Sequence, residues 1–471
     1  MTRTWLAIAV LLTVHGAAAQ SPRPNAAGSR PLAPAAIVRL DYVADTLPNG
    51  LRVVYHVDRS TPVVAVEVWY DVGAKHEAPG RTGLAHLFEH MMFKGSRNVA
   101  DGQHHALLAA AGAAGVNGGT STDWTSYVEQ VPSNQLELAL WMEADRMGTL
   151  LETLDQKKLD NQREVVKNER RESIDNQPYG SSTEVLMAAA FPAPHPYHHA
   201  ILGSLTDLSA ASLDDVRQFF RTYYAPNNAV LVMAGDFELT EAQRLVRKHF
   251  AAISRGPTIP ARQSASLPPL LGSAQRQVVR DANAPSPAVF MAFRVPTARD
   301  SGWATVPLLA SVLADGKSGR LYNSLVRERQ LATDVFGSNV GLLDGADLLI
   351  FGATGRPGVD PVKLEHALQH VIDSARAGVS QQELDRVRAG ARFRFVDGLQ
   401  QMREFNGRAD MLAQGAINFH DPNWVNTVLP HYDAVTVAQL RSLAAERLVP
   451  TNRVTVVYVP ARTARTSGVA P

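Results

Sequence analysis

The sequence predicts an α+β protein built from two similar domains, and three observations support this prediction. The chain has 471 residues, too many for one hydrophobic core, so two or more domains are expected. Each half mixes strand-like runs with long helical runs, which favours helices packed on a sheet. Each half also ends in the same order of helix, Pro-Asn turn and β-branched strand, which indicates a duplication.

The N-terminus has the features of a secretory signal peptide. Arg3 gives it a positive start, residues 5–14 are apolar, and residues 17–19 offer a small-residue cleavage site. The apolar run is shorter than the ~20 residues of a membrane span, although a retained N-terminal anchor is the alternative. We predict a signal peptide at 1–19 and a disordered lead-in at 20–36. The mature protein is therefore expected to be periplasmic or secreted, exported from a bacterium, without a membrane span.

A Pro-, Ser- and Ala-rich stretch at residues 254–273 indicates a linker. It divides the mature chain into an N-terminal domain at 37–253 and a homologous C-terminal domain at 274–462, followed by a flexible tail at 463–471. We expect no further segment that could cross a bilayer.

The repeat is clearest where each half ends. A helix at 213–224 leads through a Pro-Asn turn into a strand at 229–235, and a helix at 437–448 leads through a similar turn into a strand at 453–459. Earlier in each half, a strand precedes a helix. These pairs are predicted at residues 63–70 and 82–94, and at 288–295 and 301–314.

Composition excludes some classes of function. Lys and Arg number 46 and Asp and Glu 45, so no global field favours nucleic acid or an acidic partner. The chain has no cysteine, which rules out disulfides and thiol catalysis.

One short motif contains residues that could bind a metal and transfer a proton. His86, Glu89 and His90 form the pattern H-x-x-E-H within an apolar run. On a helix the two histidines lie on one face, and neutral imidazoles are good zinc ligands. A carboxylate beside the open metal position can take a proton from water. The alternative is a solvated polar stripe, but the apolar flanks indicate a buried helix whose polar groups need partners.

A catalytic zinc needs a third protein ligand. The charged stretch at 161–172 has good helix formers and neither Gly nor Pro. Its composition alone leaves Glu164, Glu169 and Glu172 as open candidates.

Several stretches together resemble the insulinase/pitrilysin family of inverted zinc metallopeptidases, which includes the mitochondrial processing peptidase. The inverted motif is the family's signature, and the similarity extends over residues 48–53, 71–77 and 117–127 to nearly the whole mature chain. The resemblance implies two domains, each a mostly antiparallel sheet packed with helices, that together form half of a clamshell. It also implies a Zn²⁺-dependent endopeptidase that cuts peptides or unfolded segments in an enclosed chamber.

The resemblance also assigns roles to single residues. The family pattern E-R-x-x-V-x-x-E matches residues 162–169 and makes Glu169 the third zinc ligand beside His86 and His90. Glu89 becomes the general base. Gln162 stands where the family has an acid that supports the metal ligands without binding the metal. This difference puts the fine tuning of the metal site in doubt, rather than metal binding itself. Asn117 resembles a substrate-holding residue, although an Asn that begins a Gly-rich turn is the alternative.

The second half has no zinc motif, since residues 308–312 are plain core. The family often carries an Arg-x6-Tyr pair in this half for gripping substrate. Arg327 matches the arginine, whereas the tyrosine position falls on Thr333 or Asp334. A solvated helix-end charge is the alternative for Arg327. Because the family encloses its chamber with four domains, we expect a homo- or heterodimer, with a zinc-less homologue that has the complete pair as the hypothesised partner.

Two other classes of function stay open. A non-catalytic structural or assembly subunit would keep the fold, but such subunits generally lose part of the zinc set. A peptide-binding module would need no base such as Glu89. The histidines at 195–199 could suggest a second metal site, but His198 and His199 follow three prolines and are expected in a surface loop.

Overall fold

The computed structural model describes residues 39–260, 267–402 and 407–461. The predicted signal peptide, lead-in and C-terminal tail lie outside these residues, as does the middle of the predicted linker. The remaining linker residues, 254–260 and 267–273, contain neither helix nor strand. The described chain from Leu40 onward belongs to one unit.

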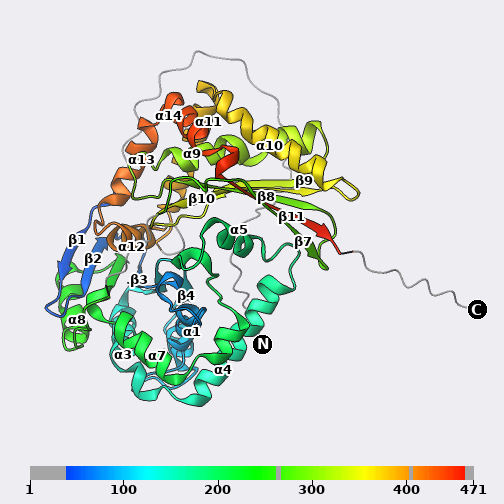
Figure 1. Cartoon of the computed structure of the whole chain (residues 1–471). Coiled ribbons are helices and arrows are strands. Elements are labelled where there is room, and N and C mark those ends of the chain that lie inside the picture. Colours follow the sequence, from blue (N-terminus) through cyan, green and yellow to red (C-terminus); the bar gives the residue numbers. More distant parts are fainter. Residues whose placement is uncertain (1–38, 261–266, 403–406, 462–471) are drawn as a thin grey trace, which may run out of the picture. The chain divides into compact units, whose positions relative to one another are not determined.

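The first sheet has six strands in the order β1-β2-β6-β3-β5-β4 (Figure 1). Neighbouring strands are antiparallel except β2 and β6. β4 forms one edge and pairs only with β5. The strands are β1 (Val43–Thr46), β2 (Arg52–Val57), β3 (Val63–Tyr70), β4 (Ala114–Thr120), β5 (Thr125–Pro132) and β6 (Ala229–Gly235).

The second sheet has five strands in the order β7-β11-β8-β10-β9, and only β7 and β11 are parallel. The prediction of two mostly antiparallel sheets is therefore confirmed. The strands are β7 (Gln275–Asp281), β8 (Ala288–Val295), β9 (Ala332–Asn339), β10 (Asp347–Gly355) and β11 (Arg453–Pro460).

Helices follow the strands in each half. The first half contains α1 (Leu84–Met91), α2 (Gln103–Ala110), α3 (Leu136–Thr153), α4 (Gln156–Arg170), α5 (Ser182–Ala190), α6 (Leu205–Ala210), α7 (Leu213–Tyr223) and α8 (Leu239–Phe250). The second contains α9 (Thr305–Ala314), α10 (Pro361–Ala377), α11 (Gln381–Gly398), α12 (Arg408–Asn418), α13 (Trp424–Ala434) and α14 (Val437–Arg447). Short π-helices lie at Arg171–Asp175 (η3) and Tyr322–Glu328 (η7).

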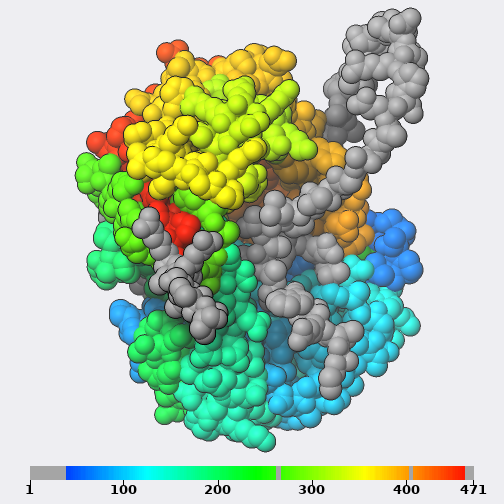
Figure 2. Space-filling view, turned by 90° about the vertical axis from the view of Figure 1, so that its right-hand side faces the viewer, coloured from blue at the N-terminus to red at the C-terminus, as the bar shows by residue number. Residues whose placement is uncertain are grey.

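Each sheet is covered on both faces, and each half supplies a helix to the other half's sheet. One face of the first sheet packs on α1, α3, α7 and α8, and the opposite face packs on α12. One face of the second sheet packs on α9, α10, α11 and α14, and the opposite face packs on α5. Figures 1 and 2 show the orange segment around α12 beside the blue strands β1 and β2. The apolar cores thus join the two halves.

The duplication is visible in matching hydrogen bonds. Asn228 closes the turn before β6 by donating from Nδ2 to Tyr223 O (2.9 Å) and Asp71 O (3.1 Å). Asn452 closes the turn before β11 by donating to Arg447 O (2.8 Å) and Arg294 O (2.9 Å). In both halves the Asn side chain joins the end of the preceding helix to a neighbouring strand segment.

Some predictions differ from the structure, and the helix expected at 301–314 begins only at Thr305. The helix expected at 82–94 is shorter, because Gly83 has a φ of +88° and residues beyond Met92 turn away. Residues 117–127 contain two strands and a turn: Asn117 lies within β4 opposite Val128, so its alternative assignment to a turn is wrong. Within residues 39–260, 267–402 and 407–461, no helix has the length and apolar character that crossing a bilayer requires.

Candidate functional site

The helix that carries the motif is fixed at its N-terminus by two devices. The Glu77 carboxylate accepts hydrogen bonds from Gly83 N (2.8 Å) and Ala85 N (2.7 Å), which satisfies two amides of the first turn. Gly83 takes a left-handed conformation, and a Cβ there would lie 2.8 Å from Leu202 O. These contacts set the position at which α1 presents its histidines.

The two histidines and Glu169 converge. His86 and His90 lie on one face of α1 with ring centroids 4.8 Å apart. Helix α4 packs against α1 and carries Glu169 near its C-terminal end. One Glu169 carboxylate oxygen lies 3.7 Å from His86 Nε2, and the other lies 3.2 Å from His90 Nε2. The structure thus brings together the three side chains that the resemblance had assigned to the metal.

This geometry fits a zinc ion. Two ligand atoms about 2.1 Å from a tetrahedral metal are separated by about 3.4 Å, close to the 3.7 and 3.2 Å between the two Glu169 oxygens and the two ring nitrogens. His90 Nε2 is buried and has no hydrogen-bond partner among the described residues, so its contact with Glu169 is not a well-formed hydrogen bond. A buried nitrogen without a partner is costly, and a shared cation would satisfy it.

Glu89 is held differently from Glu169. Its Oε2 atom lies 4.0 Å from His86 Nε2 and accepts a hydrogen bond of 2.7 Å from Thr120 Oγ1 on β4. In the described chain, His86, Glu89 and His90 form the one group of three potential ligands whose atoms all lie within 4.8 Å. Glu89 is nevertheless farther from the His86 nitrogen than Glu169 is. Its position suits a base beside a metal better than a third ligand.

Edge strand β4 lies directly against Glu89. A Cβ on Gly118 would lie 3.0 Å from both Cγ and Oε1 of Glu89 and 3.2 Å from the Phe93 ring. Only a residue without a side chain leaves Glu89 this room. Sequence reasoning missed both Gly118 and Thr120, because their contacts depend on how β4 crosses α1.

The charges of the site shape its pKa values. Burial, reinforced by His90, lowers the pKa of His86 to about 4, against the attraction of Glu169. Burial raises the pKa of Glu89 to about 7, although His90 and the Thr120 hydrogen bond oppose this. For His90, burial lowers the pKa, but Glu169 and Glu89 outweigh it and the net shift is upward.

The pKa of Glu169 moves the other way. Burial raises it, but His90 and His86 together outweigh burial, and the pKa is lowered. Glu169 therefore stays ionised at neutral pH, which a metal ligand requires. The buried Gln162 side chain also helps to raise the pKa of His90, so this neutral residue acts on the imidazole where the family pattern has an acid.

The other two acids of the helix face elsewhere. Glu164 is 61% exposed and pairs with Lys167 at 2.8 Å, and Glu172 is exposed on the π-helix that follows α4. The composition had left all three acids open, and the geometry favours Glu169 alone.

The two predicted substrate-binding residues occupy different settings. Asn117 is half-buried in β4, one residue from Gly118. Arg327 is exposed at the end of η7 in the second half, and no hydrogen bond or ion pair joins it to a described residue. The structure does not bring Arg327 into the histidine cluster.

The surface loop predicted at His198 and His199 is half-buried, and His198 ends a short helix. His195 is buried with its ring stacked on Phe191 at 4.9 Å, and His198 Nδ1 lies 2.7 Å from Phe191 O within a 3₁₀-helix, η4 (Pro196–His198). Tyr197 is fully buried in the core beneath α5. Aromatic packing therefore pulls this segment inward.

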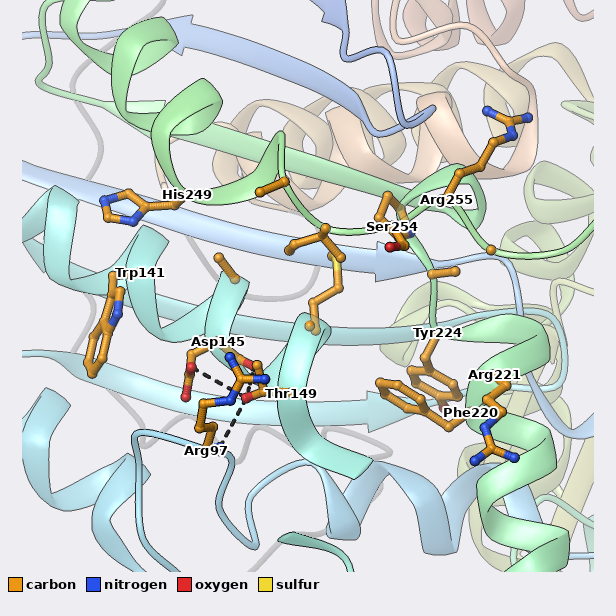
Figure 3. Close-up of a pocket in the computed structure, with 18 of the residues that line it drawn as sticks. Arg97, Trp141, Asp145, Thr149, Phe220, Arg221, Tyr224, His249, Ser254 and Arg255 are labelled. Atoms are coloured by element: carbon orange, nitrogen blue, oxygen red, sulfur yellow. Dashed lines mark hydrogen bonds between the residues drawn. The ribbon is translucent and has the colours of Figure 1, made fainter. Parts of the chain in front are cut away.

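A cavity of about 650 Å³ lies among α3, α7, α8 and residues 252–257 (Figure 3). None of the predicted site residues lines it. Three of its charged or titratable side chains have partners: Asp145 accepts from Ser96 and Asn98, Arg97 pairs with Glu152, and His249 lies 3.2 Å from Glu137. The predicted zinc chemistry lies outside this cavity.

Comparison with known families agrees with the fold. Residues 52–201 match the family model described as "Insulinase (Peptidase family M16)", and residues 210–391 match the one described as "Peptidase M16 inactive domain". The chain belongs to the M16 peptidase family. The resemblance drawn from the sequence is therefore confirmed.

Individual relatives support the same class. The chain is 29% identical over 375 residues to the zinc protease PqqE of Helicobacter pylori, covering 79% of this chain and 83% of that protein. A crystal structure of an H. pylori protease matches with 27% identity and a TM-score of 0.84, covering 90% of this chain and all of that one. The periplasmic protease PqqL of Escherichia coli shares the fold at 18% identity and a TM-score of 0.72, covering 93% of this chain but 50% of PqqL.

Proposed function

We propose that this protein is a zinc-dependent endopeptidase in which His86, His90 and Glu169 hold the metal and Glu89 is the general base. The observation that carries the proposal is the different placement of two carboxylates, one beside both imidazoles and one set back from them. Glu169 lies within 3.7 Å of both ring nitrogens, whereas Glu89 stands 4.0 Å from the nearer one and is held by Thr120. The names of the relatives, zinc proteases, support the choice of metal and reaction.

The bound zinc would polarise the scissile carbonyl and lower the pKa of a water molecule. The chain's own residues supply the proton transfers. Glu89, with its pKa raised to about 7 by burial, can accept the proton of the attacking water and later give it to the leaving amine, because a base works best with a pKa near the operating pH. The Thr120 hydroxyl keeps one carboxylate oxygen oriented.

Substrate would lie along β4. This strand pairs with β5 on one side and has no strand on the other within the described chain. An extended peptide can add to such an edge through backbone hydrogen bonds. Gly118 and Gly119 leave room for it, and Asn117 is in reach of a peptide bound there. Peptides and unfolded segments, which can extend, are therefore the proposed substrates.

The enclosed chamber requires a second set of domains. This chain matches half the length of PqqL, which supports a dimer as the working form. A homodimer would offer Arg327 without its tyrosine, so a zinc-less homologue with the complete Arg/Tyr pair is the proposed partner. Strong peptidase activity of the purified monomer would contradict an obligatory partner.

The compartment is part of the same proposal. The N-terminal signal pattern supports export to the periplasm or beyond, and the relative PqqL is described as periplasmic. N-terminal sequencing of the mature protein is expected to begin at Gln20.

The decisive test compares wild type with Glu89→Gln on a quenched peptide library. We expect both proteins to bind one zinc and the variant to lose about 10²- to 10⁴-fold in rate. Equal activity would remove Glu89 from the mechanism. Absence of cleavage in both proteins would favour the non-catalytic subunit or the peptide-binding module.

A further inference from the structure

We propose that Lys75 is a positioning residue for this reaction, tying a loop of the second half to the turn behind β4 and so holding Thr120 and Glu89 in place. This inference rests on the proposed function. It joins two regions far apart in the sequence, because the loop at residues 340–346 connects β9 and β10.

Lys75 bridges the two halves through a buried cation. Its Nζ donates to Asp123 Oδ1 of the first half and to Asp344 Oδ2 of the second, both at 2.7 Å. The Lys75 and Asp123 side chains are only 8% and 4% exposed. A charge removed this far from water needs its partners, so the bridge fixes both carboxylates.

A tyrosine reinforces the same junction. The Tyr197 hydroxyl donates to Asp123 Oδ1 at 2.7 Å and accepts from Leu343 N at 3.2 Å and Asp344 N at 3.0 Å. Asp123 thus receives one bond from Lys75 and one from Tyr197, and both donors also contact the loop.

The loop itself is rigidly held. Asp347 Oδ1 accepts from Gly341 N, Leu342 N and Leu348 N at 2.8 to 3.0 Å. Arg299 donates to Asp344 Oδ1 at 2.7 Å and to Asn418 O at 3.1 Å. Asp344 therefore presents a fixed carboxylate to Lys75.

The turn at residues 121–124 is gripped on its backbone as well. Ala74 N donates to Ser121 O (3.1 Å) and Lys75 N donates to Thr122 O (2.9 Å). A Cβ on Gly73 would lie 2.4 Å from Ser121 O, so the two segments touch. The residue just before this turn is Thr120, which donates to Glu89. A continuous set of contacts therefore runs from Asp344 through Lys75 and the turn to the general base.

Loss of Lys75 would leave Asp123 and Asp344 facing each other without their shared cation. The turn would loosen and Thr120 would no longer hold Glu89 in one orientation. The metal ligands come from α1 and α4. The segment that carries Lys75 packs on α1, but the bonds of the Lys75, Asp123 and Asp344 side chains go to one another, to Tyr197 and to Arg299, and Glu77 still holds the start of α1, so zinc binding should persist. Misplacement of a catalytic group by a fraction of an ångström to 1 Å lowers turnover by about 10- to 100-fold.

The test uses the full-length protein and the variants Lys75→Met and Asp344→Asn. Arg276→Met is the matched control, because it breaks a different ion pair, between β7 and α10 (Arg276–Glu365, 2.9 Å). We expect both test variants to keep their zinc, lose about tenfold or more in kcat with KM within about threefold, and exchange the amides of residues 114–125 about tenfold faster. The control should match wild type in each.

The outcomes separate this inference from the proposed function. If Lys75→Met does not fold, Asp344→Asn, whose side chain is 37% exposed, decides. Unchanged amide exchange in the test variants, or an unchanged kcat, overturns the role of Lys75. If wild type with bound zinc cuts no peptide, the proposed function fails, and amide exchange alone then decides whether Lys75 orders β4.

Discussion

Glu169 on α4 places a carboxylate oxygen 3.2 Å from His90 Nε2 on α1. The two residues come from helices separated by two strands, a turn and two further helices. Helix α1 alone offers two imidazoles and Glu89, and only the packing of α4 adds a carboxylate within reach of both rings. The proposed metal centre is therefore a product of tertiary structure.

Replacing Glu169 with Gln should weaken zinc binding by more than about 100-fold, since the loss of supporting groups alone costs 10- to 100-fold in metal sites. Zinc titration against a chelator measures this. Glu172→Gln is the matched control, because Glu172 is exposed three residues away and should leave affinity unchanged. Similar losses in both variants would show that general charge matters rather than ligation.

Zinc binding should weaken as pH falls below neutrality. A ligand imidazole must be neutral, and Glu169 and Glu89 raise the pKa of His90, so a proton competes with the metal there. His86, with its pKa near 4, stays neutral over the same range. Below the His90 pKa, the affinity should fall about tenfold per pH unit. Titrations at several pH values measure this slope, and a flat profile would contradict His90 as a ligand.

A side chain at position 118 should impair catalysis more than folding. In Gly118→Ala the new Cβ would crowd Glu89 at 3.0 Å, and Gly118 does not have a positive φ, so the backbone tolerates Ala. We expect the zinc content and thermal stability of wild type with a kcat lowered by about tenfold or more. The control is Gly148→Ala, because a Cβ there would have its nearest neighbour at 3.5 Å and should fit without strain. Gly112→Ala is unsuitable as a control, because Gly112 has a φ of +84°.

Thr120 should matter through its hydroxyl alone. Thr120→Val keeps the shape but removes the 2.7 Å hydrogen bond to Glu89. We expect kcat to fall by about tenfold, the net worth of a hydrogen bond to a charged group being about 1.5–3 kcal/mol. Thr120→Ser keeps the donor and should retain most activity. Equal rates for the Val and Ser variants would mean that the bond does not orient the base.

Local patterns predicted much of the fold. The strands at 63–70, 229–235 and 288–295 coincide with β3, β6 and β8. Runs of β-branched residues bounded by turn residues strongly favour the strand conformation. Helix ends were less predictable. The left-handed Gly83 sets where α1 begins, and it packs so closely on Leu202 that a Cβ would lie 2.8 Å from Leu202 O, a contact that no local pattern contains.

The exchange of helices and the arrangement around Glu89 lay beyond sequence reasoning. An apolar helix face does not indicate which sheet it will cover. The sequences of α5 and α12 therefore did not predict that each packs on the sheet of the other half. The charge pattern of residues 161–172 left three acids open, because all three lie in one run of similar polarity. In the sequence, Lys75 resembles an ordinary surface lysine. Its two partners, Asp123 and Asp344, lie far from it along the chain and are brought to it only by folding.

Anomalous diffraction at the zinc absorption edge, from crystals of the zinc-loaded protein, tests the central claim most directly. The account predicts one peak bonded to His86 Nε2, His90 Nε2 and the Glu169 carboxylate at about 2.0–2.2 Å, with Glu89 outside bonding distance. A peak elsewhere, or one bonded by Glu89 in place of Glu169, would contradict it.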